Sequence, residues 1–262
     1  MILMTVETPY DPRALFDIEG RVAIVTGASS GLGRQFAVAL HAAGAQVVAV
    51  ARREERLVEL AEQCPGLVAH RLDVTDEAGC AALVDDVVKR FGRIDLLVNN
   101  AGLGTPAPAV DEELDSFRYT LEVDLVSCFN LARLVARPMI AAGSGSIVNI
   151  ASVYGIGSSY PVPNASYTAA KGAIVNLTRE LGAQWGKHGV RVNAIAPGFF
   201  RSEAAEEAFT NEKAHARLTL ATPMRRLGAE RELDGALIYL ASNASSYVNG
   251  HTLVVDGGYT TH

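Results

Sequence analysis

The hydrophobic positions of the chain fall into short β-branched runs that alternate with longer stretches of helical periodicity. The short runs predict buried strands at Val22–Thr26, Val47–Ala51, Leu67–Leu72, Ile94–Val98, Ser146–Ile150, Val190–Ala196 and Thr252–Val255. The periodic stretches predict helices at Gly33–Ala43, Glu54–Gln63, Glu77–Phe91, Leu114–Ala142, Ser166–Lys187 and Arg231–Ala241. Gly44 and Gly189 stand where C-terminal helix caps are expected. This alternation is typical of a doubly wound, Rossmann-type α/β fold, a parallel sheet with helices on both faces.

The domain organisation expected from this rhythm is simple. No repeat or linker interrupts it, so residues 17–262 are predicted to form a single domain after an N-terminal tail of residues 1–16. One stretch departs from the alternation. Phe199–Leu220 is polar and alanine-rich and follows a predicted strand directly. An insertion at the carboxyl end of a strand is a candidate substrate lid in this architecture.

Composition and charge narrow the classes of function. The net charge of −6 provides no basic field for nucleic acid. Cys64, Cys80 and Cys128 are scattered and lack metal-ligand spacing, which favours neither disulfides nor a zinc site and fits a reducing cytoplasm. The N-terminus lacks the basic region of a secretory signal. No apolar run is expected to reach the roughly 18–20 residues that a membrane span needs.

A glycine-rich loop follows the first predicted strand and leads directly into a helix. Thr26–Gly33 has the spacing Gly-x-x-x-Gly-x-Gly. Such glycines let the backbone turn tightly and approach a pyrophosphate, whose charge then lies at the helix N-terminus. The alternative is a glycine-rich turn without a ligand. The residues expected to contact a dinucleotide here are Gly27, Ser29, Ser30, Gly31, Leu32 and Gly33.

The end of the second strand bears on the choice of cofactor. Dinucleotide folds that select NAD usually place an acid there, whereas an arginine accommodates the 2′-phosphate of NADP. Ala51 occupies the expected position of the acid, and Arg52 follows with a planar, permanently charged guanidinium. Glu54 and Glu55 fit the first turn of the next helix. The sequence therefore favours NADP and leaves NAD possible; the alternative for Arg52 is a solvated surface cation.

Further motifs complete a set that resembles one family, the short-chain dehydrogenase/reductases, over roughly residues 16–259. They are Asp73-Val74, Asn99-Asn100-Ala101-Gly102, Ser152, Tyr167-x-x-x-Lys171, Pro197-Gly198 and Asp256-Gly257-Gly258. The resemblance implies an oxidoreductase that transfers a hydride between a nicotinamide and a small-molecule ketone or secondary alcohol. The additional cofactor contacts that it implies are Asp73, Val74, Asn100, Ala101, Gly102, Tyr167, Lys171, Pro197 and Gly198. A helix N-cap for Asp73 and bracing of the sheet by Asn99–Gly102 are the alternatives.

The family resemblance also suggests a homotetramer. The patterns Leu114–Ala142 and Ser166–Lys187 are more apolar than one sheet-facing stripe requires. That excess fits helices packed across a two-fold axis.

The catalytic chemistry expected of this set depends on helical spacing. Tyr167 and Lys171 are four residues apart and therefore share one helix face. A phenol, with an ordinary pKa near 10, is a poor base at neutral pH, but an adjacent ammonium and an oxidised nicotinamide favour the phenolate. The resemblance implies that Tyr167 is the acid/base, that Lys171 also binds the nicotinamide ribose, and that Ser152 holds the substrate oxygen.

The chain departs from the family pattern at two places. Where the family has an asparagine that holds a relay water, this chain has Asp124, which can accept from water but cannot donate when ionised. We expect its negative charge near Lys171; the alternative is that it turns away into a local hydrogen bond. Ser152 and Tyr167 are also 15 residues apart, about two more than the family pattern. The extra residues lie in Gly155–Asn164 and are expected to reshape one wall of the pocket.

Two other classes of function share part of this pattern. A non-catalytic dinucleotide-binding regulator would keep the glycine loop but would not need Ser152, Tyr167 and Lys171 together. A sugar-nucleotide epimerase or dehydratase shares Tyr-x-x-x-Lys but belongs with longer chains that carry a separate substrate lobe. Turnover of a nicotinamide with a ketone or alcohol would distinguish the three classes, whereas the fold does not define the substrate.

Overall fold

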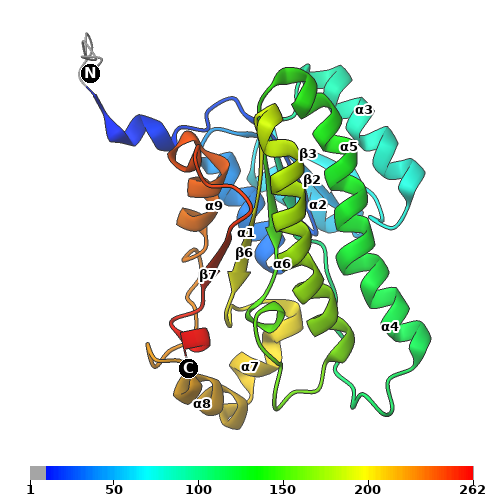
Figure 1. The fold of residues 1–262 in the computed structure, drawn as a ribbon, viewed down its shortest axis with the longest axis vertical. Coiled ribbons are helices and arrows are strands. Elements are labelled where there is room, and N and C mark those ends of the chain that lie inside the picture. The colour runs from blue at the N-terminus through cyan, green and yellow to red at the C-terminus, as the bar shows by residue number, and fades with distance from the viewer. Residues whose placement is uncertain (1–9, 262) are drawn as a thin grey trace.

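A computed structural model describes residues 10–261 of the chain. Within them, a parallel sheet of seven strands has the order β3-β2-β1-β4-β5-β6-β7 (Figure 1). The strands are β1 (Val22–Thr26), β2 (Gln46–Ala51), β3 (Val68–Arg71), β4 (Leu96–Asn99), β5 (Gly145–Ile150), β6 (Val190–Pro197) and β7 (Thr252–Val255). Every predicted strand is present. The strand order reverses between β1 and β4, and ligands of such sheets bind at the carboxyl ends of the strands at this point.

Helices cover both faces of the sheet, as predicted. The helices on one face are α1 (Gly31–Ala42), α2 (Glu54–Gln63) and α9 (Asp234–Ala241), and those on the other are α3 (Glu77–Phe91), α5 (Ser127–Ala142) and α6 (Ala165–Trp185). Successive strand residues point to opposite faces. Val25 therefore packs in the core with Phe36 of α1, whereas Ile24 packs in the core with Leu83 of α3.

The long helical pattern at Leu114–Ala142 contains a local change of geometry. It consists of α4 (Leu114–Leu121), a π-helical turn at Glu122–Val126, and α5. Such π turns are rare and are frequent at functional sites. This turn carries Asp124, which is buried.

By length and composition, this same Leu114–Ala142 helix would be able to cross a membrane, with a mean hydropathy of 1.3 over an 18-residue window. The expectation that no segment passes this test was therefore wrong. The apolar residues have a different use here, because Leu131, Val135 and Met139 are buried against the sheet.

Two other predicted helices end or begin differently. The last helix begins at Asp234 and not at Arg231, because Arg231 has a left-handed φ of 71° that a helix interior does not accommodate. The helix expected to reach Lys187 ends at Trp185 and continues as a 3-10 turn, Gly186–His188. Gly189 then adopts a φ of +78°, as its expected capping role requires.

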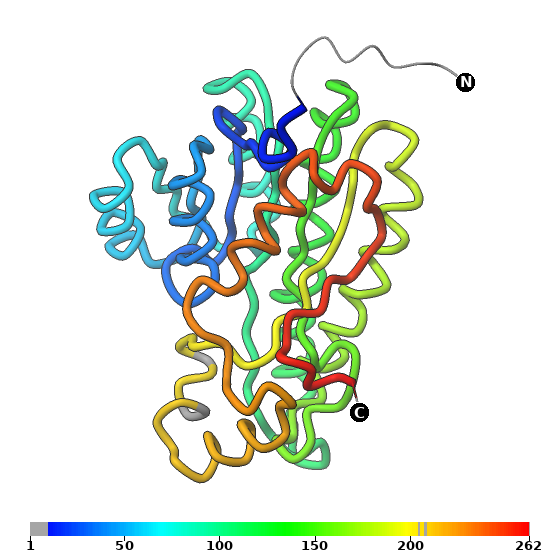
Figure 2. The backbone as a smooth tube through the Cα atoms, turned by 90° about the vertical axis from the view of Figure 1, so that its left-hand side faces the viewer, coloured from blue at the N-terminus to red at the C-terminus, as the bar shows by residue number. Residues whose placement is uncertain are grey.

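The segment predicted as a lid is mostly helical. It contains a 3-10 turn (Glu203–Ala205), α7 (Glu206–Thr210) and α8 (Glu212–Ala221). Figure 2 shows these elements at one end of the molecule, beyond the carboxyl ends of the strands. The base of the segment is tied down where the Gly228 N–H donates to the Phe199 carbonyl at 2.9 Å.

The predicted N-terminal tail is described only from residue 10 onward, so residues 1–9 lie outside the described part. Pro12–Phe16 form a 3-10 helix whose N-cap is Asp11. Figure 1 shows this turn projecting from the body of the molecule.

Candidate active site

A cavity of about 670 Å³ lies at the carboxyl ends of the strands and brings the predicted residues together. The predicted site residues that line it are Gly27, Ser29, Ser30, Gly31, Leu32, Arg52, Asp73, Val74, Asn100, Ala101, Gly102, Ser152, Tyr167, Lys171, Pro197 and Gly198. Gly33 and Asp124 do not line it. Gly33 packs inside the glycine loop, and Asp124 contacts Lys171 from behind the cavity wall.

The glycine loop has the geometry that a diphosphate needs. Gly27 has a left-handed φ of +68°, and α1 begins at Gly31 with no side-chain hydrogen bond on its N-terminus. The first-turn N–H groups therefore remain available to an anion. A Cβ atom at Gly33 would overlap the Gly27 carbonyl and the Asn100 side chain, so only glycine allows α1 to pack this closely. These residues fit the expected dinucleotide.

Thr26 and Asn100 hold the floor of the cavity in place. The Thr26 hydroxyl accepts hydrogen bonds from the backbone N–H groups of Asn100 and Ala101, both at 2.9 Å. The Asn100 side chain donates to the Thr26 carbonyl at 2.9 Å. Asn99 is buried and donates to Asn149 on β5 at 3.0 Å. Asn99 therefore braces the sheet, while Asn100 both braces the loop and lines the cavity.

Arg52 and Asp73 lie together at the rim of the cavity. The Arg52 guanidinium donates to the Tyr119 hydroxyl at 3.3 Å and lies 3.7 Å from the Asp73 carboxylate, with 65% of its side chain exposed. Asp73 accepts from the N–H and hydroxyl of Thr75, at 3.1 and 2.9 Å. The N-cap of α3 is Asp76, so Asp73 lies in the segment that leads into this helix and is not the cap residue itself.

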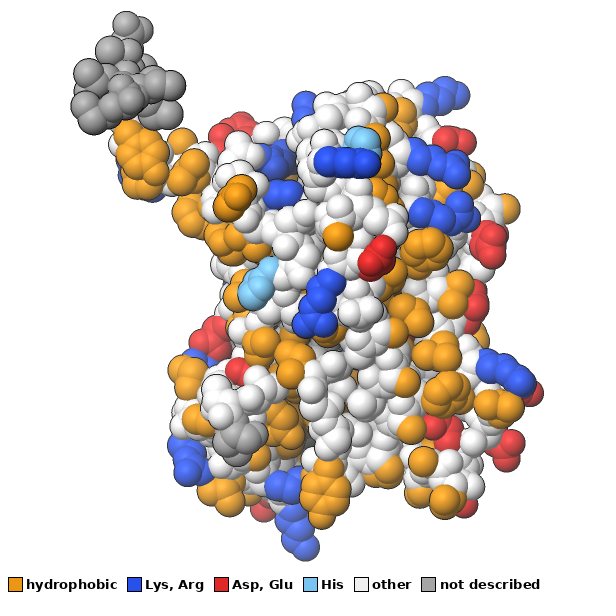
Figure 3. Space-filling view, viewed as in Figure 1, with side chains coloured by type: hydrophobic (Ala, Val, Ile, Leu, Met, Phe, Trp, Pro, Cys, Tyr) orange, Lys and Arg blue, Asp and Glu red, His pale blue; other side chains and the backbone are white. Residues whose placement is uncertain are grey.

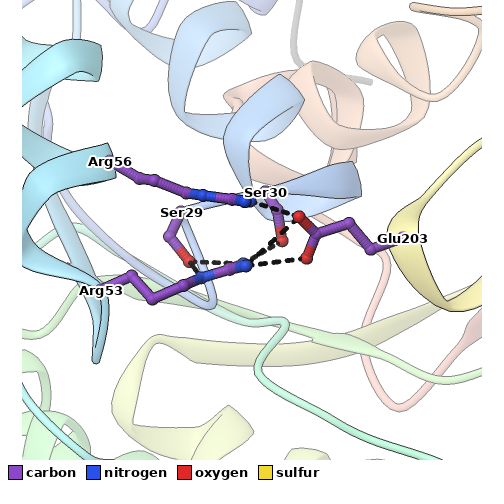
Figure 4. Close-up of polar contacts among 5 residues, drawn as sticks. All are labelled: Ser29, Ser30, Arg53, Arg56 and Glu203. Carbon is purple, nitrogen blue, oxygen red and sulfur yellow. Dashed lines mark hydrogen bonds and ion pairs between the residues drawn. The ribbon is translucent and has the colours of Figure 1, made fainter.

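Sequence reasoning missed a charged cluster beside the glycine loop (Figure 4). The Arg53 guanidinium donates to the hydroxyls of Ser30 at 2.6 Å and Ser29 at 3.1 Å, and it pairs with Glu203 at 3.0 Å. Arg56 also pairs with Glu203. Hydrogen bonds from Arg56 and Arg53 lower the pKa of Glu203 to about 2, although partial burial opposes the shift. Arg53 follows the predicted Arg52, and Glu203 lies in the predicted lid segment, but their pairing has no signal in the sequence.

The catalytic candidates converge from β5 and α6. Ser152 follows β5, and its hydroxyl accepts from the Tyr154 N–H at 3.1 Å. The Lys171 ammonium lies 5.4 Å from the centre of the Tyr167 ring, as the helical spacing predicted. It also donates to the Ile150 carbonyl at 3.1 Å.

Asp124 and Lys171 form a buried ion pair. Their Oδ2 and Nζ atoms are 3.1 Å apart, with 0% and 5% of the side chains exposed. The second carboxylate oxygen, Oδ1, accepts from the Leu103 N–H at 2.7 Å. Asp124 therefore faces Lys171 as expected and also makes the local hydrogen bond of the alternative. Burial lowers the pKa of Lys171, but the charge of Asp124 and the nearby Tyr167 outweigh it, so this pKa lies above its usual value.

The end of the cavity that holds Tyr167 also has residues that the sequence did not single out. Tyr154, Asn164, Phe199 and Arg217 all line it. Burial raises the pKa of Tyr154 to about 12, so this phenol stays neutral. The Gly155–Asn164 segment forms part of one wall of the cavity, as predicted. A hydrogen bond of 3.0 Å from the Ala107 N–H to the Pro163 carbonyl of this segment holds it in place.

The fold and the cavity define a dinucleotide-dependent oxidoreductase of the Rossmann type, and comparison with known proteins places it in a family. Residues 27–260 match the sequence family described as "Enoyl-(Acyl carrier protein) reductase" (adh_short_C2). The chain belongs to the short-chain dehydrogenase/reductases.

Similar proteins include two curated dehydrogenases and a solved structure. The chain is 39% identical to gluconate 5-dehydrogenase of Gluconobacter oxydans, over 94% of this chain and 97% of that one. It is 39% identical to D-threitol dehydrogenase of Mycolicibacterium smegmatis, over 94% and 95%. The crystal structure of gluconate 5-dehydrogenase from Burkholderia cenocepacia in complex with NADP and tartrate is 39% identical, with a TM-score of 0.90 and coverage of 95% and 98%.

These findings confirm the predicted class of enzyme. The protein transfers a hydride between a nicotinamide cofactor and a carbonyl or secondary-alcohol group of a small molecule. The comparisons support neither rival class, since these relatives are dehydrogenases and match the chain over nearly their full length.

Proposed function

We propose that the protein is an NADP-dependent dehydrogenase/reductase of small polyhydroxylated alcohols or sugar acids. One observation carries the proposal: a single cavity has Ser152, Tyr167 and Lys171 at one end and arginine side chains at the other. The names of the relatives support the substrate class, since they act on gluconate and D-threitol. The solved relative with bound NADP supports the cofactor.

The cofactor would lie along the glycine loop, with its diphosphate at the N-terminus of α1 and its adenosine end near Arg52 and Asp73. Asn100–Gly102 and Pro197–Gly198 would line the remainder of its path. When bound, the nicotinamide supplies or accepts the hydride.

The protein side chains would handle the proton and the substrate oxygen. The Ser152 hydroxyl already accepts from Tyr154, so its own proton is available to donate to the substrate oxygen. Tyr167 would donate a proton to this oxygen in reduction and remove it in oxidation. Lys171 donates to the Ile150 carbonyl and pairs with Asp124, and its ammonium would also donate to the cofactor ribose.

Polar groups at the substrate end favour a polyhydroxylated ligand. Asn164 provides an amide, and Arg217 places a guanidinium on the wall formed by α8. A guanidinium suits a carboxylate, so a sugar acid fits as well as a sugar alcohol. The segment 199–220, which carries Arg217, would act as the substrate lid of the catalytic domain 17–262.

A substrate panel tests this proposal. Aldonic acids, tetritols, hexitols and a simple alcohol such as 2-butanol are assayed with NADP and with NAD by nicotinamide absorbance. We expect the highest kcat/KM with NADP and a polyhydroxylated substrate. Equal kcat/KM for 2-butanol and the polyols would contradict the substrate class, and faster turnover with NAD would contradict the cofactor.

The strand tip provides a separate test of cofactor choice. Arg52→Ala is expected to weaken NADPH binding by about 1–3 kcal/mol for a lost charged hydrogen bond, while NADH binding changes little. Ala51→Asp places a carboxylate beside the 2′-phosphate and should shift the preference toward NAD. Fluorescence titration of both cofactors measures the effect. Equal losses for NADPH and NADH in Arg52→Ala would show that Arg52 does not read the phosphate.

We further propose that the enzyme is a cytoplasmic homotetramer assembled through α4 and α5. Apolar side chains on these helices are exposed, and Figure 3 shows hydrophobic side chains along this side of the molecule. These residues are Leu114, Tyr119, Val126 and Phe129. Such a patch on a charged surface is typical of a subunit interface.

Light scattering at micromolar concentration should therefore give a tetramer mass. Phe129→Asp should lower this mass by placing a charge in the interface. Val58→Asp, at an exposed apolar position on α2, is the matched control and should leave the tetramer intact. A monomer mass for the unmodified protein would rule out the assembly.

A further inference from the structure

A carboxylate from the lid occupies the phosphate end of the cofactor cavity. Glu203 begins the turn that follows Ser202, yet its side chain reaches the start of α2 (Figure 4). There it pairs with Arg53 at 3.0 Å and with Arg56. Glu203, Arg53, Ser29 and Ser30 all line the cavity.

The groups around this carboxylate are those that bind phosphate. Two guanidinium groups surround it, and Arg53 also holds the hydroxyls of Ser29 and Ser30, at 3.1 and 2.6 Å. Arginine and hydroxyl donors bind carboxylate and phosphate oxygens with similar geometry. An anion from the protein therefore occupies an anion-binding position, inside a cavity that must also accept an anionic cofactor.

The base of the lid holds Glu203 in this position. Ser202 packs against the glycine loop so closely that a Cβ atom on Gly31 would lie 3.1 Å from the Ser202 Cβ. The Ser202 hydroxyl accepts from the Ala205 N–H at 3.2 Å and so caps the turn that carries Glu203. With a pKa of about 2, Glu203 is ionised at neutral pH.

We propose that Glu203 determines cofactor selection by competing with the 2′-phosphate of NADP for Arg53 and Arg56. The inference rests on the proposed use of NADP. The 2′-phosphate is the group concerned because Arg53 lies two residues beyond the last residue of β2, close to where the ribose 2′ position is read. The diphosphate lies instead at the N-terminus of α1. NAD leaves the Glu203 pairs intact, whereas NADP must displace them.

The competition predicts a gain of affinity when the charge is removed. Glu203→Gln keeps the shape of the side chain, and it should bind NADP and 2′,5′-ADP about three- to tenfold more tightly, as expected for exposed ion pairs. Binding of NAD and 5′-AMP should stay within about twofold of the wild type because neither carries a 2′-phosphate. Isothermal titration calorimetry at low salt with the four ligands measures these changes.

Glu206→Gln is the matched control. Glu206 begins α7 in the same lid, pairs with Arg201 at 2.7 Å, and is not among the residues that line the cavity. It should bind all four ligands as the wild type does. In steady-state assays, Glu203→Gln should lower the KM for NADP with little change in kcat, which a general loosening of the lid would not produce.

Two results would overturn the inference. Unchanged or weaker binding of 2′,5′-ADP by Glu203→Gln would show that the carboxylate does not compete. An equal gain in affinity for 5′-AMP would show that the Glu203 carboxylate opposes cofactor binding in general and does not compete with the 2′-phosphate. The proposed use of NADP has its own readout, because it requires wild-type protein to bind 2′,5′-ADP more tightly than 5′-AMP. If that preference is absent, a selective gain in Glu203→Gln still supports the competition.

Discussion

Replacing Tyr167 by phenylalanine is expected to lower kcat about a thousandfold, the usual contribution of a general acid/base. The substitution keeps the aromatic ring beside Lys171 and removes the one proton that can be exchanged with the substrate oxygen. Cofactor affinity should be retained, because the diphosphate and adenosine contacts lie on the glycine loop and β2. Steady-state rates together with fluorescence titration of NADPH separate the two effects.

The cavity offers a control for this experiment in a second tyrosine. Tyr154 lines the same end, and burial raises its pKa to about 12, which makes it a poor proton donor and base. Tyr154→Phe should keep kcat within about tenfold of the wild type, because no proton transfer is assigned to it. A Tyr167→Phe enzyme with more than about a tenth of wild-type activity would contradict the mechanism.

Removing the Asp124 carboxylate is expected to destabilise the protein strongly. Asp124→Ala leaves Lys171 as a buried cation and the Leu103 N–H without its acceptor, at a cost of about 3–5 kcal/mol in the free energy of unfolding. In Asp124→Asn an amide oxygen can still accept from Leu103, so we expect a smaller loss of about 1–3 kcal/mol. Urea denaturation measures both values.

The pH dependence of this loss follows from the direction of the Lys171 shift. The pKa of Lys171 lies above its ordinary value because Asp124 outweighs the effect of burial. The stability that the ion pair contributes is therefore fully present at pH values below the ordinary pKa of lysine. It is lost as the pH rises through the raised pKa of Lys171 in the folded protein. The difference in stability between the wild type and Asp124→Asn should stay nearly constant from about pH 6 to 9 and shrink only in strong alkali. A difference that disappeared near neutral pH would exclude the ion pair as its source.

Asp124→Asn should also change the pH profile of alcohol oxidation. The carboxylate stabilises the Lys171 ammonium and offsets part of the positive field that favours a phenolate. The wild-type optimum should therefore be alkaline, and the variant optimum should lie closer to neutral with activity kept or raised. Asp95→Asn is the control, because it removes another buried carboxylate that is not part of the cavity lining. Asp95 accepts a hydrogen bond from the Val22 N–H at 2.9 Å, and its replacement should leave the pH profile unchanged.

Two outcomes would contradict this account of Asp124. Superimposable profiles for the wild type and Asp124→Asn would leave the carboxylate a purely structural role. An inactive but folded Asp124→Asn enzyme would mean that the carboxylate takes a direct part in the chemistry.

The fold and most of the cavity lining were predictable from sequence because they depend on local periodicity and on strand ends. Alternating apolar runs predicted every strand, and parallel strands bring their carboxyl ends to one edge, where Gly27, Ser152 and Pro197 meet. The spacing of Tyr167 and Lys171 places both on one face of α6 by helix geometry alone.

The tertiary structure decided what depends on side chains that meet from distant elements. The sequence singled out Arg52 for the 2′-phosphate, and the structure adds Arg53, which holds the serines of the glycine loop while Arg52 donates to Tyr119, because adjacent residues beyond a strand point in different directions. Glu203 joins Arg53 across 150 positions of sequence only because the start of the lid, at Ser202, packs against Gly31 at the N-terminus of α1. The sequence predicted a carboxylate near Lys171, but the π turn that carries Asp124 and the hydrogen bond from the Leu103 N–H hold this carboxylate at 3.1 Å from the ammonium. Periodicity and spacing describe positions along one element, whereas such contacts depend on how separate elements pack.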